Sequence, residues 1–444
     1  MSSITANNTA GTDKQASGKW YDIDNKYSSL LSWSVILLLI VLAYIKFPLS
    51  SPTVGDEDYY ADEVAYLSQY GVYNALSQGT SVLLSLLIFL FSKLLSVSFL
   101  VGARILSIVF FTGGCAIFHK LTRRFGGLSH AAGNFALLCF GMVCYEWLWK
   151  CLADIISVSI ILGVLYLLAG RYTKKQLLMA GLLLMAGFAV KPLIMMTVPG
   201  FVALLFLNGY INGRIPFATR AINILLFLIA FGVPFIAYHI PGYITYHKLM
   251  LEDKDHHYEG PARVTNHTSW VEKNVYFEVY NVNKKPNKWM VSWAEVDSFK
   301  AQHPEIDLNL SPAKFRKQHF GVWSRNVGER ALLNLPYSIQ SSFFFSKWTA
   351  VNRFVKNITI IRVIALLLVG GMYWRERKFV RDNAAVLAVS LIYYLLLCMY
   401  VIPQLEDNWL IFCMPLLSIP VVKFLERYIP VLALLALQLL FILL

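Results

Sequence analysis

Apolar residues in this chain gather into runs of about 15–20, the length that a helix needs to cross roughly 30 Å of hydrocarbon. Of the 444 residues, 57% are hydrophobic and 15% are charged. This pattern predicts an all-α polytopic membrane protein with about eleven transmembrane helices. The expected spans are 30–47, 99–118, 131–149, 152–169, 177–190, 193–207, 221–240, 358–374, 384–402, 409–426 and 428–444.

One further apolar stretch, "SVLLSLLIFLFSKLLSVSFL" at residues 81–100, is interrupted by Lys93. If this stretch crossed the membrane, the loop before it, residues 48–80, would lie on the cytoplasmic side. If it lies in the interface, or dips in and returns, that loop is external. We expect the interfacial arrangement, which adds one interfacial helix to the spans.

Basic residues set the orientation of the spans. Clusters of Lys and Arg follow every second span, so they share one side, which the positive-inside rule makes the cytoplasm. Their members are Lys120, Arg123, Arg124, Arg171, Lys174, Lys175, Arg214, Arg220, Arg375, Arg377, Lys378, Arg381, Lys423 and Arg427. These loops explain the net charge of +13. Since no basic stripe with stacking aromatics occurs, nucleic acid is not an expected partner.

The pattern divides the chain into four regions. Residues 1–29 are a polar tail that we expect to be disordered and cytoplasmic, followed by an N-terminal transmembrane module at 30–240. Residues 241–350 form an external loop domain, and residues 351–444 form the C-terminal transmembrane helices. The first apolar run lacks a small-residue cleavage site, so we expect it to remain as a span.

The external loop domain, residues 241–350, is predicted to have mixed structure. Ser311 and Pro312 begin a helix whose apolar positions recur at helical spacing, and Pro336 ends it. The stretch "NVYFEVYNV" alternates like a strand, or forms an extended loop. All six cysteines lie in or beside apolar segments, so a disulfide framework in this domain is excluded.

Candidate chemistry lies in "VGDEDYYADEVAYLSQYG", residues 54–71, just after the first span. Asp56 there is a candidate general base for an acceptor hydroxyl, and the alternative is a solvated acidic loop end. Lys191, next to Pro192, lies at the external turn of the hairpin 177–207. It either snorkels to the interface or meets an anion such as a lipid phosphate. A hydroxyl acceptor and a lipid-phosphate leaving group would require such a carboxylate and such a cation.

Over most of residues 30–430 the chain resembles the GT-C superfamily of membrane glycosyltransferases, and in particular the protein O-mannosyltransferases and lipid A aminoarabinose transferases. In that branch, the first external loop opens with an Asp-Glu pair followed by an aromatic residue. The second span opens with Arg-Leu-x-Ser and ends in a basic pair before Phe-Gly. The matching residues here are Asp56-Glu57-x-Tyr59-Tyr60, Arg104-Ile105-Leu106-Ser107 and Arg123-Arg124-Phe125-Gly126.

The resemblance extends to later spans. The acidic residue that opens the fourth span of the family is matched by Asp154, and the lysine that ends the fifth by Lys191. Near the C-terminus the family has an external Arg-Tyr pair, where this chain has Asn408-Trp409. Because that arginine is missing, Lys191 or a basic residue of the large loop would have to supply the donor-phosphate contact.

The resemblance implies an inverting glycosyltransferase that works at the external membrane face. Its donor would be a sugar on a polyprenyl phosphate and its acceptor a lipid or a glycan. Asp56 is the implied base, Glu57 binds the acceptor or a cation, and Asp62 with Glu63 is the alternative acidic pair. The implied substrate-binding residues are Lys191, Asp154, Glu146, Arg104, Tyr59, Tyr60, Glu63 and Asn408. For Asp154, helix capping is an equal alternative, and Arg104 either extends outward from a helix end or contacts a phosphate.

Other expectations concern cofactors, partners and competing functions. No cofactor and no resident metal are expected, with Mg²⁺ or Mn²⁺ at "DED" (residues 56–58) as the alternative. We expect a monomer in a bacterial inner membrane, with its active site on the periplasmic side. A transporter or flippase would instead place charges along a path through the bundle. An O-antigen-type polymerase would rely on arginines in the external loop.

Overall fold

A computed structural model describes most of the predicted helical regions of the chain. The described residues are 25–46, 48–52, 57–77, 82–125, 127–148, 153–211, 215–247, 359–401 and 411–428, with short pieces between 298 and 335. Within these residues the structure is helical and contains no strand, as the all-α prediction requires. The possible strand "NVYFEVYNV" and the predicted span at 428–444 lie outside them, apart from Tyr428.

The helices follow the predicted apolar runs closely. In chain order they are α1 (Asn25–Lys46), α2 (Glu57–Ser77), α3 (Val82–Leu95), α4 (Phe99–Thr122), α5 (His130–Leu148), α6 (Ala153–Leu168), α7 (Lys174–Val190), the 3₁₀ turn η1 (Pro192–Thr197), α8 (Val198–Ile211), α9 (Phe217–Tyr246), α15 (Thr359–Arg375), α16 (Arg377–Asp382), α17 (Ala384–Leu396), the π-helical turn η3 (Leu397–Val401) and α19 (Cys413–Leu425). Two of these, Phe99–Thr122 and Phe217–Thr245, are long and apolar enough to cross a membrane.

Two predicted boundaries were wrong. The run expected to end at residue 240 continues as α9 to Tyr246, with Pro234 and Pro241 inside the helix. Proline removes one backbone hydrogen bond from a helix but need not end it when packing holds the neighbouring turns. The run expected to begin as a regular helix at residue 193 starts as the 3₁₀ turn η1, because Pro192 follows directly on the end of α7.

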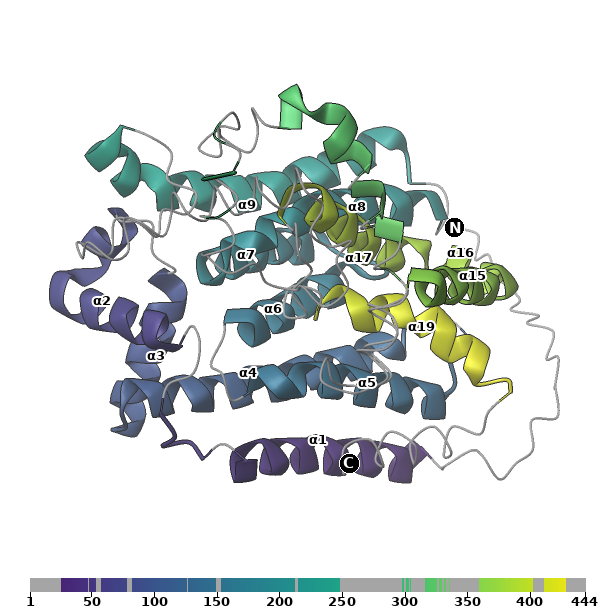
Figure 1. The fold of residues 1–444 in the computed structure, drawn as a ribbon, viewed down its shortest axis with the longest axis horizontal. Coiled ribbons are helices and arrows are strands. Elements are labelled where there is room, and N and C mark those ends of the chain that lie inside the picture. Colours follow the sequence, from purple (N-terminus) through teal and green to yellow (C-terminus); the bar gives the residue numbers. More distant parts are fainter. Residues whose placement is uncertain are drawn as a thin grey trace, which may run out of the picture.

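Figure 1 shows most of the long helices side by side, with α1 along one edge of the bundle and α9 along the opposite edge. Neighbouring pairs are α1 with α5, α4 with α6, α6 with α7, α7 with α9, and α17 with both α8 and α19. One large cluster of buried apolar side chains runs through α4–α9, α17 and α19. Helices α2 and α3 gather at one end of this bundle (Figure 1).

Several predicted basic segments meet at one end, which we call the basic end (described residues 123–125, 127–129, 169–173, 375–383 and 423–428). The Arg124 guanidinium donates to the carbonyls of Tyr166 and Ala169. The Asn208 amide donates to the carbonyl of Gly170 at 2.8 Å, and the rings of Phe125 and Phe379 stack. These contacts bring the residues that follow α4, α6 and α15 together with the last turn of α8.

The opposite end holds the end of α1, the helices α2 and α3, and the start of α4. We call it the acidic end, after Glu57, Glu63 and Asp154. The Tyr44 hydroxyl, near the end of α1, donates to the carbonyls of Arg104 and Leu148 at 3.3 Å each. The chain therefore leaves α1 and enters α4 at the same end. It follows that α2 and α3 together make no net crossing of the bundle.

Helix α3 packs against the acidic-end turns of three longer helices. Its 14 residues span about 21 Å. Its buried Leu84 and Ile88 lie in one cluster with Ala103, Ala153 and Val190, which belong to the acidic-end turns of α4, α6 and α7. Helix α3 therefore lies beside the acidic-end turns of these helices, and the interfacial arrangement of residues 81–100 stays a prediction.

Candidate functional site

The backbone before Pro192 places Lys191 at the acidic end. A residue that precedes proline is driven out of the α region, and Lys191 has φ −149° and ψ 111°. Helix α7 therefore ends at Val190, with the Lys191 N–H still donating to the Gly187 carbonyl at 2.9 Å. The extended residue leaves the helical path, so its side chain reaches toward the first turn of α6.

Close packing of two helices supports this turn. A Cβ added to Gly187 would lie 2.8 Å from Cδ1 of Ile194 and 3.0 Å from Cγ2 of Ile160. A residue with a side chain would fit there only if the Ile194 side chain shifted, because real Cβ contacts are essentially never shorter than 3.0 Å. Gly187 thus lets α7 and η1 approach α6 closely, and the approach brings Lys191 to Asp154.

Asp154 and Lys191 form a partly buried ion pair. The Lys191 ammonium donates to Oδ1 of Asp154, and the two side chains are 19% and 5% exposed respectively. Asp154 lies in the first turn of α6, where the helix dipole favours a negative charge. The sequence predicted both residues at one external cavity, and the structure brings them into contact.

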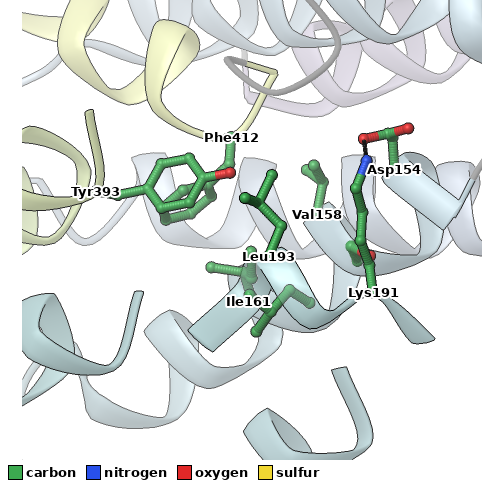
Figure 2. Close-up of a pocket in the computed structure, with 9 residues that line it drawn as sticks. Asp154, Val158, Ile161, Lys191, Leu193, Tyr393 and Phe412 are labelled. Atoms are coloured by element: carbon green, nitrogen blue, oxygen red, sulfur yellow. Dashed lines mark hydrogen bonds and ion pairs between the residues drawn. The ribbon is translucent and has the colours of Figure 1, made fainter. Parts of the chain in front are cut away.

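A small cavity opens beside this ion pair (Figure 2). Its volume is about 20 Å³, room for about one water molecule. Besides the ion pair, its lining residues are Ser157, Val158, Ile161, Leu193, Ile194, Tyr393 and Phe412. Figure 2 shows Tyr393 and Phe412 on the side away from Lys191, with Val158 and Leu193 between them and the ion pair. The cavity therefore has a charged side and an apolar, aromatic side.

Sequence reasoning missed Tyr393 and Phe412. Their ring centroids lie 5.6 Å apart in an edge-to-face arrangement, and both side chains are buried. They come from α17 and from the start of α19, more than 200 residues after Lys191. An aromatic residue in an apolar run is equally typical of a helix core, so the sequence carried no signal that separated these two from their neighbours.

A second buried ion pair joins Arg104 to Glu57. Nη2 and Nε of Arg104 donate to the two carboxylate oxygens of Glu57 at 2.9 and 3.2 Å. The same guanidinium donates to the backbone carbonyls of Pro48, Leu49, Ser51 and Pro52. All five N–H groups of an arginine can be used in such a site, and both side chains are essentially inaccessible to solvent.

This arrangement corrects one prediction. Arg104 does not extend outward from its helix end, because its side chain is 1% exposed and is held by the loop that follows α1. Glu57, predicted beside the base, has both carboxylate oxygens bound to this arginine. The pair therefore anchors the beginning of α2 to the second turn of α4, and the same arginine holds residues 48–52 there.

The remaining predicted residues fall into three groups. Glu63 is buried and accepts a hydrogen bond from the Ser85 hydroxyl at 3.1 Å, which ties α2 to α3. Tyr60 is half-buried against the core, and Asp62 is exposed. Asp56 and Asn408 lie outside the described residues, as do the side chains of Tyr59 and Glu146. Their predicted roles stay predictions.

Metal binding was searched for in the described part of the chain. There, no group of three or more His, Cys, Asp or Glu side chains could hold a metal ion. The alternative cation site at residues 56–58 includes Asp56, which lies outside that part. The chain was also compared with known proteins: no protein-family model, no curated protein and no solved structure matches it.

Proposed function

We propose that this chain is a multi-span membrane protein with its basic end in the cytoplasm. Support comes from apolar faces that no other part of the described structure covers. Exposed large apolar side chains recur at helical spacing on α1 and α9, and soluble proteins rarely expose such stripes. Those on α1 are Leu30, Trp33, Leu37, Val41 and Ile45, and those on α9 are Ile222, Leu225, Ile229, Val233, Ile236 and Ile240.

Lipid is the natural environment for these faces. Leu30 is 65% exposed and Ile45 72% exposed, so the stripe on α1 runs along nearly its whole length. Helix α15 adds Ile360, Leu367 and Trp374, each more than two thirds exposed. In the proposed orientation the positive-inside rule puts the acidic end on the external side, which is the periplasmic side of a bacterial inner membrane.

Within this arrangement, we propose a glycosyltransferase that moves a sugar from a polyprenyl phosphate to a lipid or glycan acceptor. The observation that carries the proposal is the Lys191–Asp154 ion pair on a cavity at the acidic end. That end also holds the start of α2, immediately after Asp56 in the chain. A cation and a carboxylate-bearing loop thus share one end of the bundle.

Lys191 suits the phosphate of a lipid-linked donor. An ammonium group carries three N–H donors, and Asp154 uses one of them, so two remain for phosphate oxygens. The ion pair also fixes the direction of the ammonium before a donor arrives, which lowers the ordering cost of binding. The apolar residues Val158 and Leu193 beside it suit the hydrocarbon end of such a lipid.

In the proposed reaction, Asp56 accepts the proton of the acceptor hydroxyl as its oxygen attacks the anomeric carbon. The bond from that carbon to the phosphate oxygen breaks, and the electron pair leaves with the polyprenyl phosphate. Lys191 stabilises the negative charge that develops on the leaving phosphate. Attack from the side opposite the leaving group inverts the anomeric carbon. No cofactor takes part in these steps.

The distribution of buried charge favours this proposal over a transporter or flippase. Among the described residues, the buried charged side chains are Glu57, Glu63, Arg104 and Asp154 at the acidic end and Glu376 at the basic end. A transport path would place such charges near the middle of the membrane. The charges gather at the two ends instead, as expected for chemistry at one membrane face.

The test is to incubate purified protein in nanodiscs with a panel of radiolabelled polyprenyl-phosphate sugars and membrane lipid extract, scoring transfer of label from the donor. Wild-type protein should consume one of these donors. Asp56→Asn should lower the rate at least about 100-fold, within the range attributed to a general base. Asp62→Asn is the matched control. If no donor is consumed, the proposed function fails; if Asp62→Asn alone is inactive, the base has been misassigned.

A further inference from the structure

One segment of the large loop is held against α17 and η3. Its described residues are 316–325, 327–329, 331–332 and 335, which we call the docked segment, and most of them are helical. The helix predicted to begin at Ser311 and Pro312 thus agrees with the structure over these residues. Ala331 and Leu335 pack against the main apolar cluster of the bundle.

Two hydrogen bonds attach the docked segment to α17 and η3. The Tyr394 hydroxyl donates to the Ala331 carbonyl at 3.0 Å, and Nε1 of Trp323 donates to the Met399 carbonyl at 3.3 Å. Tyr394 is fully buried, so its hydroxyl would be costly to leave without this acceptor. Met399 lies in the π-helical turn η3, and such turns occur often at functional sites.

The attachment lies next to the candidate site. Tyr394 follows Tyr393 directly on α17, and Tyr393 lines the cavity that holds Lys191 and Asp154. Adjacent residues on a helix point about 100° apart. One helix therefore presents one tyrosine to the cavity and the next to the docked segment, so the position of this segment relative to the cavity is fixed by α17.

The free face of the docked segment is amphipathic. Phe320 is 62% exposed and Leu332 58% exposed, and the Phe320 ring lies 5.5 Å from that of Trp323. Lys317 and Arg325, in the helical part of the same segment, are also exposed. Aromatic and apolar surface beside cationic groups suits a molecule with both a sugar and a hydrocarbon part.

We infer that the docked segment binds the acceptor, that this acceptor is a glycolipid, and that Trp323 and Tyr394 are positioning residues which hold the segment beside the cavity. This inference rests on the proposed function for the identity of the reaction. The binding surface itself can be tested without any transfer.

The experiment measures hydrogen exchange of residues 316–335 in full-length protein in nanodiscs, with and without a short-chain alkyl glycoside below its micelle concentration. In wild-type protein the glycoside should slow exchange in this segment. Tyr394→Phe removes one hydroxyl, and the loss of one hydrogen bond should raise exchange in the segment about 3- to 10-fold and abolish the protection. Trp323→Phe should also raise exchange and abolish the protection, and it replaces Tyr394→Phe as the test variant if Tyr394→Phe does not fold.

Tyr373→Phe is the matched control, because the Tyr373 hydroxyl donates to the Leu417 carbonyl between α15 and α19, away from the docked segment. It should leave exchange of residues 316–335 and the protection unchanged. The inference is overturned if the glycoside gives no protection, or if Tyr394→Phe and Trp323→Phe behave like Tyr373→Phe. Absence of donor consumption in the separate transfer assay would refute the proposed function and leave this binding result standing.

Discussion

The Arg104–Glu57 ion pair gives the sharpest prediction for stability. Glu57→Gln preserves the shape of the side chain but removes its charge. One oxygen of the new amide still accepts from Arg104, while its NH₂ group faces a guanidinium N–H, so one hydrogen bond is replaced by a contact between two donors. The positive charge of Arg104 then remains buried, with neutral acceptors in place of the carboxylate.

The expected loss follows from these contacts. Breaking a buried ion pair by removing one partner costs about 3–5 kcal/mol. Four carbonyl oxygens, those of Pro48, Leu49, Ser51 and Pro52, continue to accept from the guanidinium, which places the expected loss near the lower bound, about 3 kcal/mol. The exposed pair Arg381–Asp382, 74% and 50% exposed, provides the control. Arg381→Gln should cost less than about 1 kcal/mol.

Reversible unfolding in mixed detergent–lipid micelles measures both variants against wild-type protein. Glu57→Gln should lower the free energy of unfolding by at least about 2 kcal/mol more than Arg381→Gln does. If the two variants lose the same stability, the buried pair does not anchor the loop after α1. The argument that this pair positions the start of α2 would then be wrong.

Two further predictions concern the cavity and the packing of α3. Lys191→Ala should raise the donor KM about 10- to 100-fold and leave the acceptor KM unchanged, because it removes the cation paired with Asp154. Steady-state kinetics with each substrate varied in turn measures both constants. An unchanged donor KM would remove Lys191 from the site. Gly102→Ala should cost about 1–3 kcal/mol in unfolding experiments, since its Cβ would lie 2.1 Å from Oγ of Ser92, whereas Gly113→Ala, with nothing within 4 Å, should be neutral or stabilising.

The helices were predictable because apolar periodicity and chain breaks are local properties. Runs of apolar residues and the prolines and basic residues between them marked α4 to α8 within a few residues. The stretch at 81–100 was ambiguous, since its composition fits a span as well as an interfacial helix. Its placement depends on where α1 ends and α4 begins. The Arg104 contacts with residues 48–52 bring these two helix ends together, and the sequence does not encode such contacts locally.

The candidate site was predictable only in part. Lys191 stood out because charged residues are rare in apolar segments, and parity placed it at the external turn. Asp154 and Arg104 were singled out by the resemblance to the GT-C branch, but Glu57, the partner of Arg104, lies 47 residues earlier, and no local pattern encodes that pairing. Tyr393, Phe412 and Trp323 could not be identified, because only tertiary packing distinguishes them from other aromatic residues of the chain.

Cross-connections between the loops of the basic end have a mechanical consequence. Arg124, Asn208 and the Glu376–Arg427 pair each join segments that are far apart in the sequence there. A movement that admits a bulky amphiphile would therefore spread the helices at the acidic end while the basic end stays fixed. In the proposed orientation, such a hinge would keep the inner leaflet sealed while the outer one is disturbed, so the permeability barrier would survive every turnover.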